Sequence, residues 1–280
     1  MRTVVGYNEM WEPGEPGVPA DLRPEIPHPA RMYDYYLGGK DNFPSDREAA
    51  ERALAANPEF RSTARANRGF LNRAVRHVAG LGIDQFLDIG TGIPTAGNTH
   101  EIAQAVDPGA RIVYVDNDPI VLAHARALMG GTAVGRTTVI QADLREPLDL
   151  LAAAEAEKLL DFEKPMALVL AAVLHFVPDE SGPYEIVRTL LDTLAPGSHL
   201  ILSHGTADFI PAAVRDRVTG VYSKATAPLV GRSREQVTAF LDGLDVLDPG
   251  VVTVPLWRPE GDPVPGADRV SMYGAVAHKP

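Results

Sequence analysis

The sequence predicts an α/β fold in which helices flank a doubly wound, mostly parallel β-sheet. From Gln85 onward, short apolar segments of strand length alternate with segments of helical length. The first of these segments carries an acid, Asp88, and then breaks at Gly90 and Gly92, where a helix would begin. A strand, a tight turn and a helix start in this order are typical of a nucleotide-like ligand site at the carboxyl edge of a parallel sheet.

The composition allows such a fold and excludes several classes of protein. With 280 residues, 45% of them hydrophobic, the chain can bury the core of one large domain. It has no cysteine, so it has no disulfide, no thiolate metal site and no thiol nucleophile. No run of 18 apolar residues could span a bilayer, and the N-terminus lacks a signal-peptide core, so we expect a cytoplasmic protein without a membrane partner. A net charge of −11 weighs against nucleic acid as a partner.

The first 82 residues are predicted to form an arm and a helical cap. Residues 1–28 are rich in proline and glycine, which indicates an extended or partly disordered arm. Residues 29–82 form the predicted N-terminal cap. Its two predicted helices run from a capping box at residues 45–48 through position 56, and from Asn57-Pro58 to about position 78.

Residues 83–280 are predicted to form the core. We expect strands near 85–89, 111–115, 137–141, 166–172 and 198–203, and helices near 98–106, 119–129, 148–160 and 183–194. This alternation predicts a parallel sheet.

The alternation of strands and helices is interrupted by a predicted helical insertion near residues 206–242. Helices are expected near 211–222 and 233–242, the second opened by the capping box at residues 233–236. Two strands near 251–254 and 270–277 could pair as a hairpin, the second entering the sheet antiparallel.

Three successive strands deliver an acid or a glycine turn to one edge of the sheet. Asp116 ends the second strand, 26 positions after Gly90, and Asp143 follows the third. An acid at the first of these places is suited to hold a ribose. Alone, each feature could be a plain turn or a helix cap, but together they favour a cofactor site. Asp118 is predicted to be the N-cap of a helix that starts at Pro119, so Asp116 is the acid expected to face the ligand.

A nicotinamide dehydrogenase is the main rival interpretation. Its fingerprint has a third glycine where this chain has Thr95, preceded by Pro94. Asp88 would repel a pyrophosphate, whereas a carboxylate there suits a cofactor with a sulfonium, an α-amino group and no phosphate. S-adenosylmethionine fits that description.

From Gln85 to the C-terminus, the chain resembles the class I S-adenosylmethionine-dependent methyltransferases, which have a Rossmann-like core. The resemblance implies that the glycine loop surrounds the methionine part of the cofactor, that Asp116 binds the ribose hydroxyls, and that Asp143 binds the adenine amine. The chain departs from the family pattern at Pro94, where a third glycine is usual. The expected cofactor residues of the core are Asp88, Gly90, Thr91, Gly92, Asp116, Asn117, Asp143, Leu144 and Ala172.

A narrower resemblance lies in the motif PHPARMYDYYLGGKDN at residues 27–42. It is similar to a bacterial group of largely uncharacterised methyltransferases, which residues 86–94, 115–118, 173–176 and 255–259 also resemble. The resemblance implies that this motif folds over the cofactor. Met32 or Tyr36 would then cover the adenosyl group, and Gly38, Lys40 and Asn42 would approach its polar edge. The alternative is a loop with a tight turn whose tyrosines pack on the core.

Catalysis needs an aligned acceptor and, for a hydroxyl or amine, removal of a proton. His175, after the fourth strand, is the predicted general base, with His204 second and Tyr222 as an acid or orienting hydroxyl. The alternative for His175 is a loop histidine bonded to backbone. Arg61, Arg65 and Arg68 could meet an anionic substrate but are interpreted as one solvated helix face. No histidine pair has metal-site spacing, so no metal is expected.

The sequence thus predicts methyl transfer to an oxygen or nitrogen of a small molecule. The alternative is a protein that binds S-adenosylmethionine or S-adenosylhomocysteine without turnover. A nucleic-acid methyltransferase is disfavoured because Ala172-Val173-Leu174-His175 stands where a base-flipping motif would follow the fourth strand. The oligomeric state stays open, and a homo-oligomer is compatible with the sequence.

Overall fold

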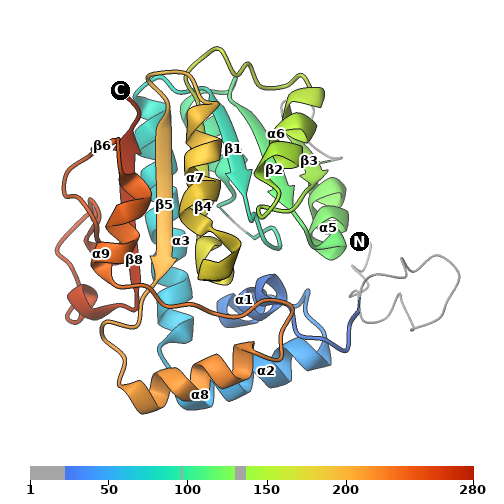
Figure 1. Ribbon diagram of the computed structural model, residues 1–280, viewed down its shortest axis with the longest axis vertical. Coiled ribbons are helices and arrows are strands. Elements are labelled where there is room, and N and C mark those ends of the chain that lie inside the picture. Colours follow the sequence, from blue (N-terminus) through green and yellow to red (C-terminus); the bar gives the residue numbers. More distant parts are fainter. Residues whose placement is uncertain (1–22, 96, 130–136) are drawn as a thin grey trace, which may run out of the picture.

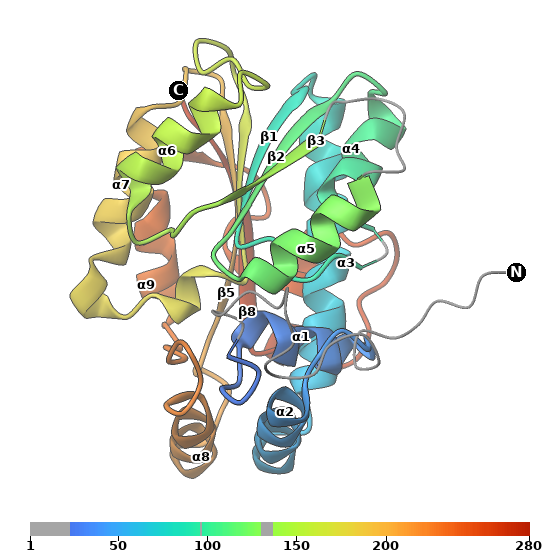
Figure 2. The same ribbon diagram turned by 90° about the vertical axis from the view of Figure 1, so that its right-hand side faces the viewer.

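The computed structural model describes residues 23–95, 97–129 and 137–280, with no account of the side chains of residues 126–129. Most of the predicted N-terminal arm, residues 1–22, therefore lies outside the described residues. Within the described part of the chain, helices flank one mixed sheet, and a helical layer lies across the carboxyl ends of its parallel strands (Figures 1 and 2).

The sheet has the strand order β3-β2-β1-β4-β5-β8-β6, and β7 pairs with β8. The first five strands are parallel, and β8 runs antiparallel to β5. This confirms the predicted fold class. The strands are β1 (Gln85–Ile89), β2 (Arg111–Asp116), β3 (Thr137–Gln141), β4 (Ala167–Ala171), β5 (His199–Gly205), β6 (Asp245–Val246), β7 (Val252–Thr253) and β8 (Met272–His278).

Alternating side chains along the strands build two cores, one on each face of the sheet. Phe86 belongs to the cluster beneath α3 and α4, whereas Leu87 belongs to the cluster beneath α6 and α7. Figure 2 shows α3, α4 and α5 on one face and α6, α7 and α9 on the other. These helices are α3 (Phe60–Gly80), α4 (Thr99–Val106), α5 (Pro119–Met129), α6 (Pro147–Ala156), α7 (Pro183–Asp192) and α9 (Arg234–Thr238).

The helical layer at the carboxyl edge consists of α1 (Pro29–Leu37), α2 (Pro44–Ala56) and α8 (Ala212–Tyr222). Helices α1 and α2 pack on each other, and α8 from the insertion packs against α2. Their shared core includes Met32, Tyr36 and Tyr222. β1 pairs with β2 on one side and β4 on the other, so the crevice where open α/β sheets bind ligands lies directly below this layer.

Helix α1 was not among the predicted helices, although its signals are local. Pro29 stands at its first turn, the His28 side chain accepts a hydrogen bond from the Ala30 N–H, and Gly38 ends it with φ +87°. Helix α2 begins at Pro44, before the expected capping box, because the Asp46 side chain accepts from the Phe43 N–H at 2.8 Å. The two-residue strand β6 was also missed.

Candidate active site

A cavity of about 500 Å³ lies between the carboxyl edge of the sheet and the helical layer. Its walls come from the ends of β1, β2, β3 and β4, from α1 and α3, and from residues 226–227 beyond α8. This volume is within the range of small-molecule sites. All nine cofactor residues predicted in the core line it: Asp88, Gly90, Thr91, Gly92, Asp116, Asn117, Asp143, Leu144 and Ala172.

The glycine turn after β1 needs its glycines for two reasons. Gly90 and Gly92 have φ values of +75° and +67°, in the left-handed region that favours glycine. A Cβ on Gly90 would also lie 2.3 Å from the Val173 side chain, which follows β4. The Gly90 N–H donates to Val115 O at 2.8 Å and so ties the turn to β2. Val173 therefore packs against the turn at Gly90, whereas nothing lies within 4 Å of the place of a Cβ on Gly92, where the backbone is open to a ligand.

Two of the acids are almost fully buried. Asp88 accepts a hydrogen bond from the Thr99 hydroxyl at 2.6 Å, and burial raises its pKa to about 6. Asp116 accepts from the N–H groups of Gly92 and Asp118, each at 2.9 Å, and burial raises its pKa to about 6 as well. Carboxylates held in this way can pair with a cation or accept hydrogen bonds from hydroxyl groups.

The third acid, Asp143, is more exposed and forms an ion pair with Arg145. The side-chain hydrogen bond from Arg145 lowers the pKa of Asp143. Asp118 accepts from the Ile120 N–H at 2.9 Å, which confirms its predicted role as the N-cap of α5.

The N-terminal motif covers the cavity with residues other than the predicted ones. His28, Arg31 and Tyr33 line it, together with Pro29 and Ala30. The five predicted contacts, Met32, Tyr36, Gly38, Lys40 and Asn42, are not among its lining residues. The reason is the helical form of α1, in which positions 32 and 36 are one turn apart and face α2 and α8 instead.

The remaining motif residues build the turn that ends α1. The Asn42 amide donates to the Asp34 carboxylate at 2.7 Å and to Gly39 O at 3.2 Å. A Cβ on Gly39 would lie 1.8 Å from an Asp34 oxygen, so no other residue fits there. Lys40 is exposed. This geometry matches the alternative interpretation of a tight turn for this half of the motif.

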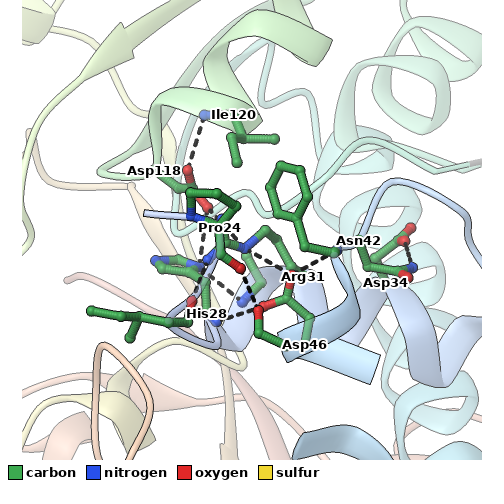
Figure 3. Close-up of polar contacts among 12 residues, drawn as sticks. Pro24, His28, Arg31, Asp34, Asn42, Asp46, Asp118 and Ile120 are labelled. Carbon is green, nitrogen blue, oxygen red and sulfur yellow. Dashed lines mark hydrogen bonds and ion pairs between the residues drawn. The ribbon is translucent and has the colours of Figure 1, made fainter. Parts of the chain in front are cut away.

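A buried ionic cluster, which we call the cap latch, joins α1 to α2 and α5 (Figure 3). It consists of His28, Arg31, Asp46 and Asp118. Arg31 Nε lies 3.2 Å from Asp46 Oδ2 and 4.0 Å from Asp118 Oδ2. His28 Nδ1 lies 3.3 Å from the same Asp118 oxygen, but burial lowers the pKa of His28 to about 4, so at neutral pH its ring is uncharged and packs beside the ion pairs of Arg31 without forming one. The cap is thereby fastened beside Asp116 on the core.

The geometry opposes the predicted general base. His175 Nδ1 accepts from the Gly205 N–H at 3.0 Å, so the neutral ring carries its proton on Nε2. The ring therefore has no free lone pair that could take a proton from the molecule to be methylated. Burial, together with the charge of Arg232, lowers the pKa of His175 to about 3. The alternative of a loop histidine bonded to backbone therefore describes His175 better.

His204 and Tyr222 are also committed to internal contacts. His204 Nδ1 donates to Gly205 O at 2.7 Å, and its Nε2 accepts from the Arg232 guanidinium at 2.8 Å. The Tyr222 hydroxyl is hydrogen bonded to the Tyr36 hydroxyl at 3.0 Å inside the packed layer, and burial raises the pKa of Tyr222 to about 12. His175, His204 and Tyr222 are all absent from the cavity lining.

The sequence interpretation assigned no cofactor contact to several further lining residues, among them Tyr33, Asn67 and Arg68. Arg65 is exposed as expected, but Arg68 lies over the cavity, near enough for its charge to lower the pKa of Asp88. One signal was available: Asn67 is a polar residue within the run of buried positions on α3. Arg68 comes four positions after the buried Ala64, so it lies on the same face of α3 one helical turn later.

Two features are absent from the described residues. No group of three or more His, Cys, Asp or Glu side chains there could hold a metal ion. Among the same residues, no helix is long and apolar enough to cross a membrane.

Solved structures resemble this chain over nearly its whole length. A DUF574 family protein from Streptomyces avermitilis MA-4680 is 45% identical, with a TM-score of 0.87 over 92% of this chain and 100% of that one. A protein from Thermobifida fusca YX, described as a candidate methyltransferase, is 35% identical, with a TM-score of 0.86 over 95% of this chain and 99% of that one. A search of curated proteins finds no match. The family model of the S-adenosyl methyltransferases matches residues 17–280, and the chain therefore belongs to this family of S-adenosylmethionine-dependent methyltransferases.

Proposed function

We propose that this methyltransferase acts on an oxygen or nitrogen of a small molecule that enters the cavity beside the methyl donor. The observation that carries the proposal is the covered cavity, in which acids from three adjacent strands face a helical roof. The roof leaves space for a small molecule rather than for a polymer. The net charge of −11 also weighs against a nucleic-acid acceptor.

The residues present fit S-adenosylmethionine along the edge of the sheet. We assign the adenine to Asp143 and Leu144 after β3 and the ribose hydroxyls to Asp116 after β2. The methionine part would lie over the open backbone of the glycine turn. Asp88 and Arg68 would pair with its α-ammonium and α-carboxylate groups, because they place opposite charges in the cavity beside this turn.

We propose that catalysis rests on alignment rather than on a histidine base. The bound cofactor supplies an activated methyl group on its sulfonium. Since His175 and His204 have no lone pair to spare, the acceptor would arrive with its nucleophile unprotonated, as a neutral amine or an ionised phenol. The same lack of a base keeps the alternative open, namely a protein that binds the cofactor or its demethylated product without turnover.

Calorimetric titration with S-adenosylmethionine, S-adenosylhomocysteine and NADH tests the cofactor site. We expect saturable binding of the first two and none of NADH. Asp116→Ala should weaken binding at least tenfold, since it removes a charged hydrogen-bond partner. Asp84→Ala, an exposed acid before β1, is the matched control and should bind normally.

Turnover is tested by the release of S-adenosylhomocysteine in the presence of pooled small phenols and amines. Release that depends on a pool member and is lost in Asp116→Ala supports the proposal. Tight donor binding with no release from any pool would instead favour binding without turnover, and equal loss of affinity in Asp84→Ala would contradict the site.

A further inference from the structure

The first residue after β4 has an unusual backbone conformation. Ala172 has φ +57°, in the left-handed region that residues other than glycine rarely adopt. It lines the cavity, and its neighbour Val173 packs against Gly90 of the glycine turn. A strained residue persists only where its surroundings hold it, and such residues cluster at functional sites.

A chain of hydrogen bonds holds Ala172 in this conformation. Its N–H is shared between the backbone oxygen and the hydroxyl oxygen of Ser203, each at 3.0 Å. The Ser203 hydroxyl donates to Asn67 Oδ1 at 2.6 Å. The Asn67 amide donates to the Tyr33 hydroxyl, which donates to Ala64 O, each at 3.0 Å. Ser203 and Asn67 are almost fully buried, which strengthens such bonds.

These linked hydrogen bonds connect the sheet to the cap. Ser203 lies on β5, Asn67 on α3 and Tyr33 on α1. Ala172, Asn67 and Tyr33 all line the cavity. The side-chain polar groups of Ser203, Asn67 and Tyr33 at this wall are thus bonded to one another.

Strand order places this wall relative to the donor. With adenine at β3, ribose at β2 and methionine at β1, the next strand in the sheet is β4, which ends at Ala172. The position beyond the methionine part is where the acceptor has to approach the methyl group. Ala172 offers no side-chain group there that could take a proton.

We propose that Ser203 and Asn67 are positioning residues that hold Ala172 against the sulfonium methyl of the donor, at the point where the acceptor arrives. This inference rests on the proposed function, because it uses the assigned direction of the donor along the sheet. It assigns to Ser203, which has no contact with the cavity, a role in the recognition of the methyl group.

Ser203→Ala tests the proposal through the ratio of the dissociation constants for S-adenosylmethionine and S-adenosylhomocysteine. S-adenosylhomocysteine lacks the methyl group and the positive charge of the sulfonium, so the ratio reports on the groups around the sulfur. Without the hydroxyl, Ala172 can relax and the wall moves. We expect S-adenosylmethionine binding to weaken about fivefold more than S-adenosylhomocysteine binding.

Ser198→Ala is the matched control. Ser198 is equally buried, and its hydroxyl oxygen accepts the Met166 N–H at 3.1 Å, at the opposite end of the sheet. The Ser198→Ala variant should lower the thermal midpoint of unfolding about as much as Ser203→Ala does, and it should leave the ratio of the two dissociation constants unchanged.

The outcomes distinguish the positioning role of Ser203 and Asn67 from the proposed function. An unchanged ratio in Ser203→Ala, or an equal change in Ser198→Ala, would overturn this inference and leave the cofactor site standing. Failure of the unaltered protein to bind either ligand would overturn the proposed function, and this inference with it.

Discussion

Single side chains in this site owe their properties to burial. Asp88 and Asp116 lie below 10% exposure at the ends of neighbouring strands, and burial raises the pKa of each to about 6. Removal from water disfavours the charged form of a carboxyl group, whereas the bonds from Thr99 and Gly92 favour it. Both acids therefore titrate just below neutral pH, where a cationic ligand can compete with the proton.

Donor affinity should accordingly depend on pH. Below a pKa of about 6, Asp88 is protonated and cannot pair with the α-ammonium group, so binding weakens as pH falls. We expect the dissociation constant of S-adenosylmethionine to fall several-fold between pH 5 and pH 7, as measured by calorimetry. Asp88→Asn should bind more weakly at pH 7 and with a flatter pH profile. An equally steep profile in this variant would show that another group titrates.

Arg68 should recognise the carboxylate of the donor. Its replacement by Met should weaken binding of S-adenosylhomocysteine about tenfold, because hydrogen bonds to charged groups contribute about 1.5–3 kcal/mol. Binding of 5′-methylthioadenosine, which lacks the amino-acid part, should not change. Arg65→Met, on an exposed position of the same helix, is the matched control. Equal losses for both ligands would place Arg68 in a structural role.

Secondary-structure elements differ in how far the sequence predicts them. The strands β1 to β5 and the acids after them were predicted within a few residues, because periodicity and glycine turns are local signals and parallel strand ends meet at one edge. The side of α1 that faces the cavity was not predictable in this way. It depends on contacts with α2, α3 and α8, which lie up to about 190 positions away in the sequence. Tyr33 was therefore missed, and Tyr36 was chosen in its place.

The cap latch makes α1 dependent on one arginine. Arg31 is 1% exposed, and its loss would leave the carboxylates of Asp46 and Asp118 buried without their cation. We expect Arg31→Met to lower the free energy of unfolding by about 3–5 kcal/mol in urea denaturation.

The matched control for the latch is Arg52→Met, at an exposed ion pair with Glu48 on α2. It should change the free energy of unfolding by less than about 1 kcal/mol. A similar small change in Arg31→Met would mean that the latch contributes nothing to the fold.

The molecule as a whole buries several neutral histidines between its layers. Burial lowers the pKa of His175 to about 3 and the pKa values of His28 and His199 to about 4. Between these values and about 6.5, the unfolded chain binds more protons than the folded one, so stability falls as pH falls. Four acids whose pKa burial raises, Asp34, Asp46, Asp88 and Asp116, oppose this loss of stability. Among the described residues they are fewer than the six histidines whose pKa burial lowers, since His77, His100 and His204 belong to that group as well.

We therefore expect the thermal midpoint to drop steadily from pH 6.5 to pH 4, as followed by circular dichroism. His175→Gln should reduce the drop, because an amide oxygen can accept the Gly205 N–H and the side chain takes up no proton. A midpoint that stays constant over this range, or an unaltered drop in His175→Gln, would contradict the account.

The cap latch also has a consequence for the timing of the reaction. It fastens the roof of the cavity to Asp118, two residues after the acid assigned to the ribose. Substrate and spent donor would share this roof, and lid opening of this kind takes microseconds to milliseconds and often limits turnover. Where release requires the roof to open, the ion pairs of Arg31 that stabilise it would also lengthen the residence time of the product. A weaker cap latch would lower the free energy of unfolding and, at the same time, speed the release of the product.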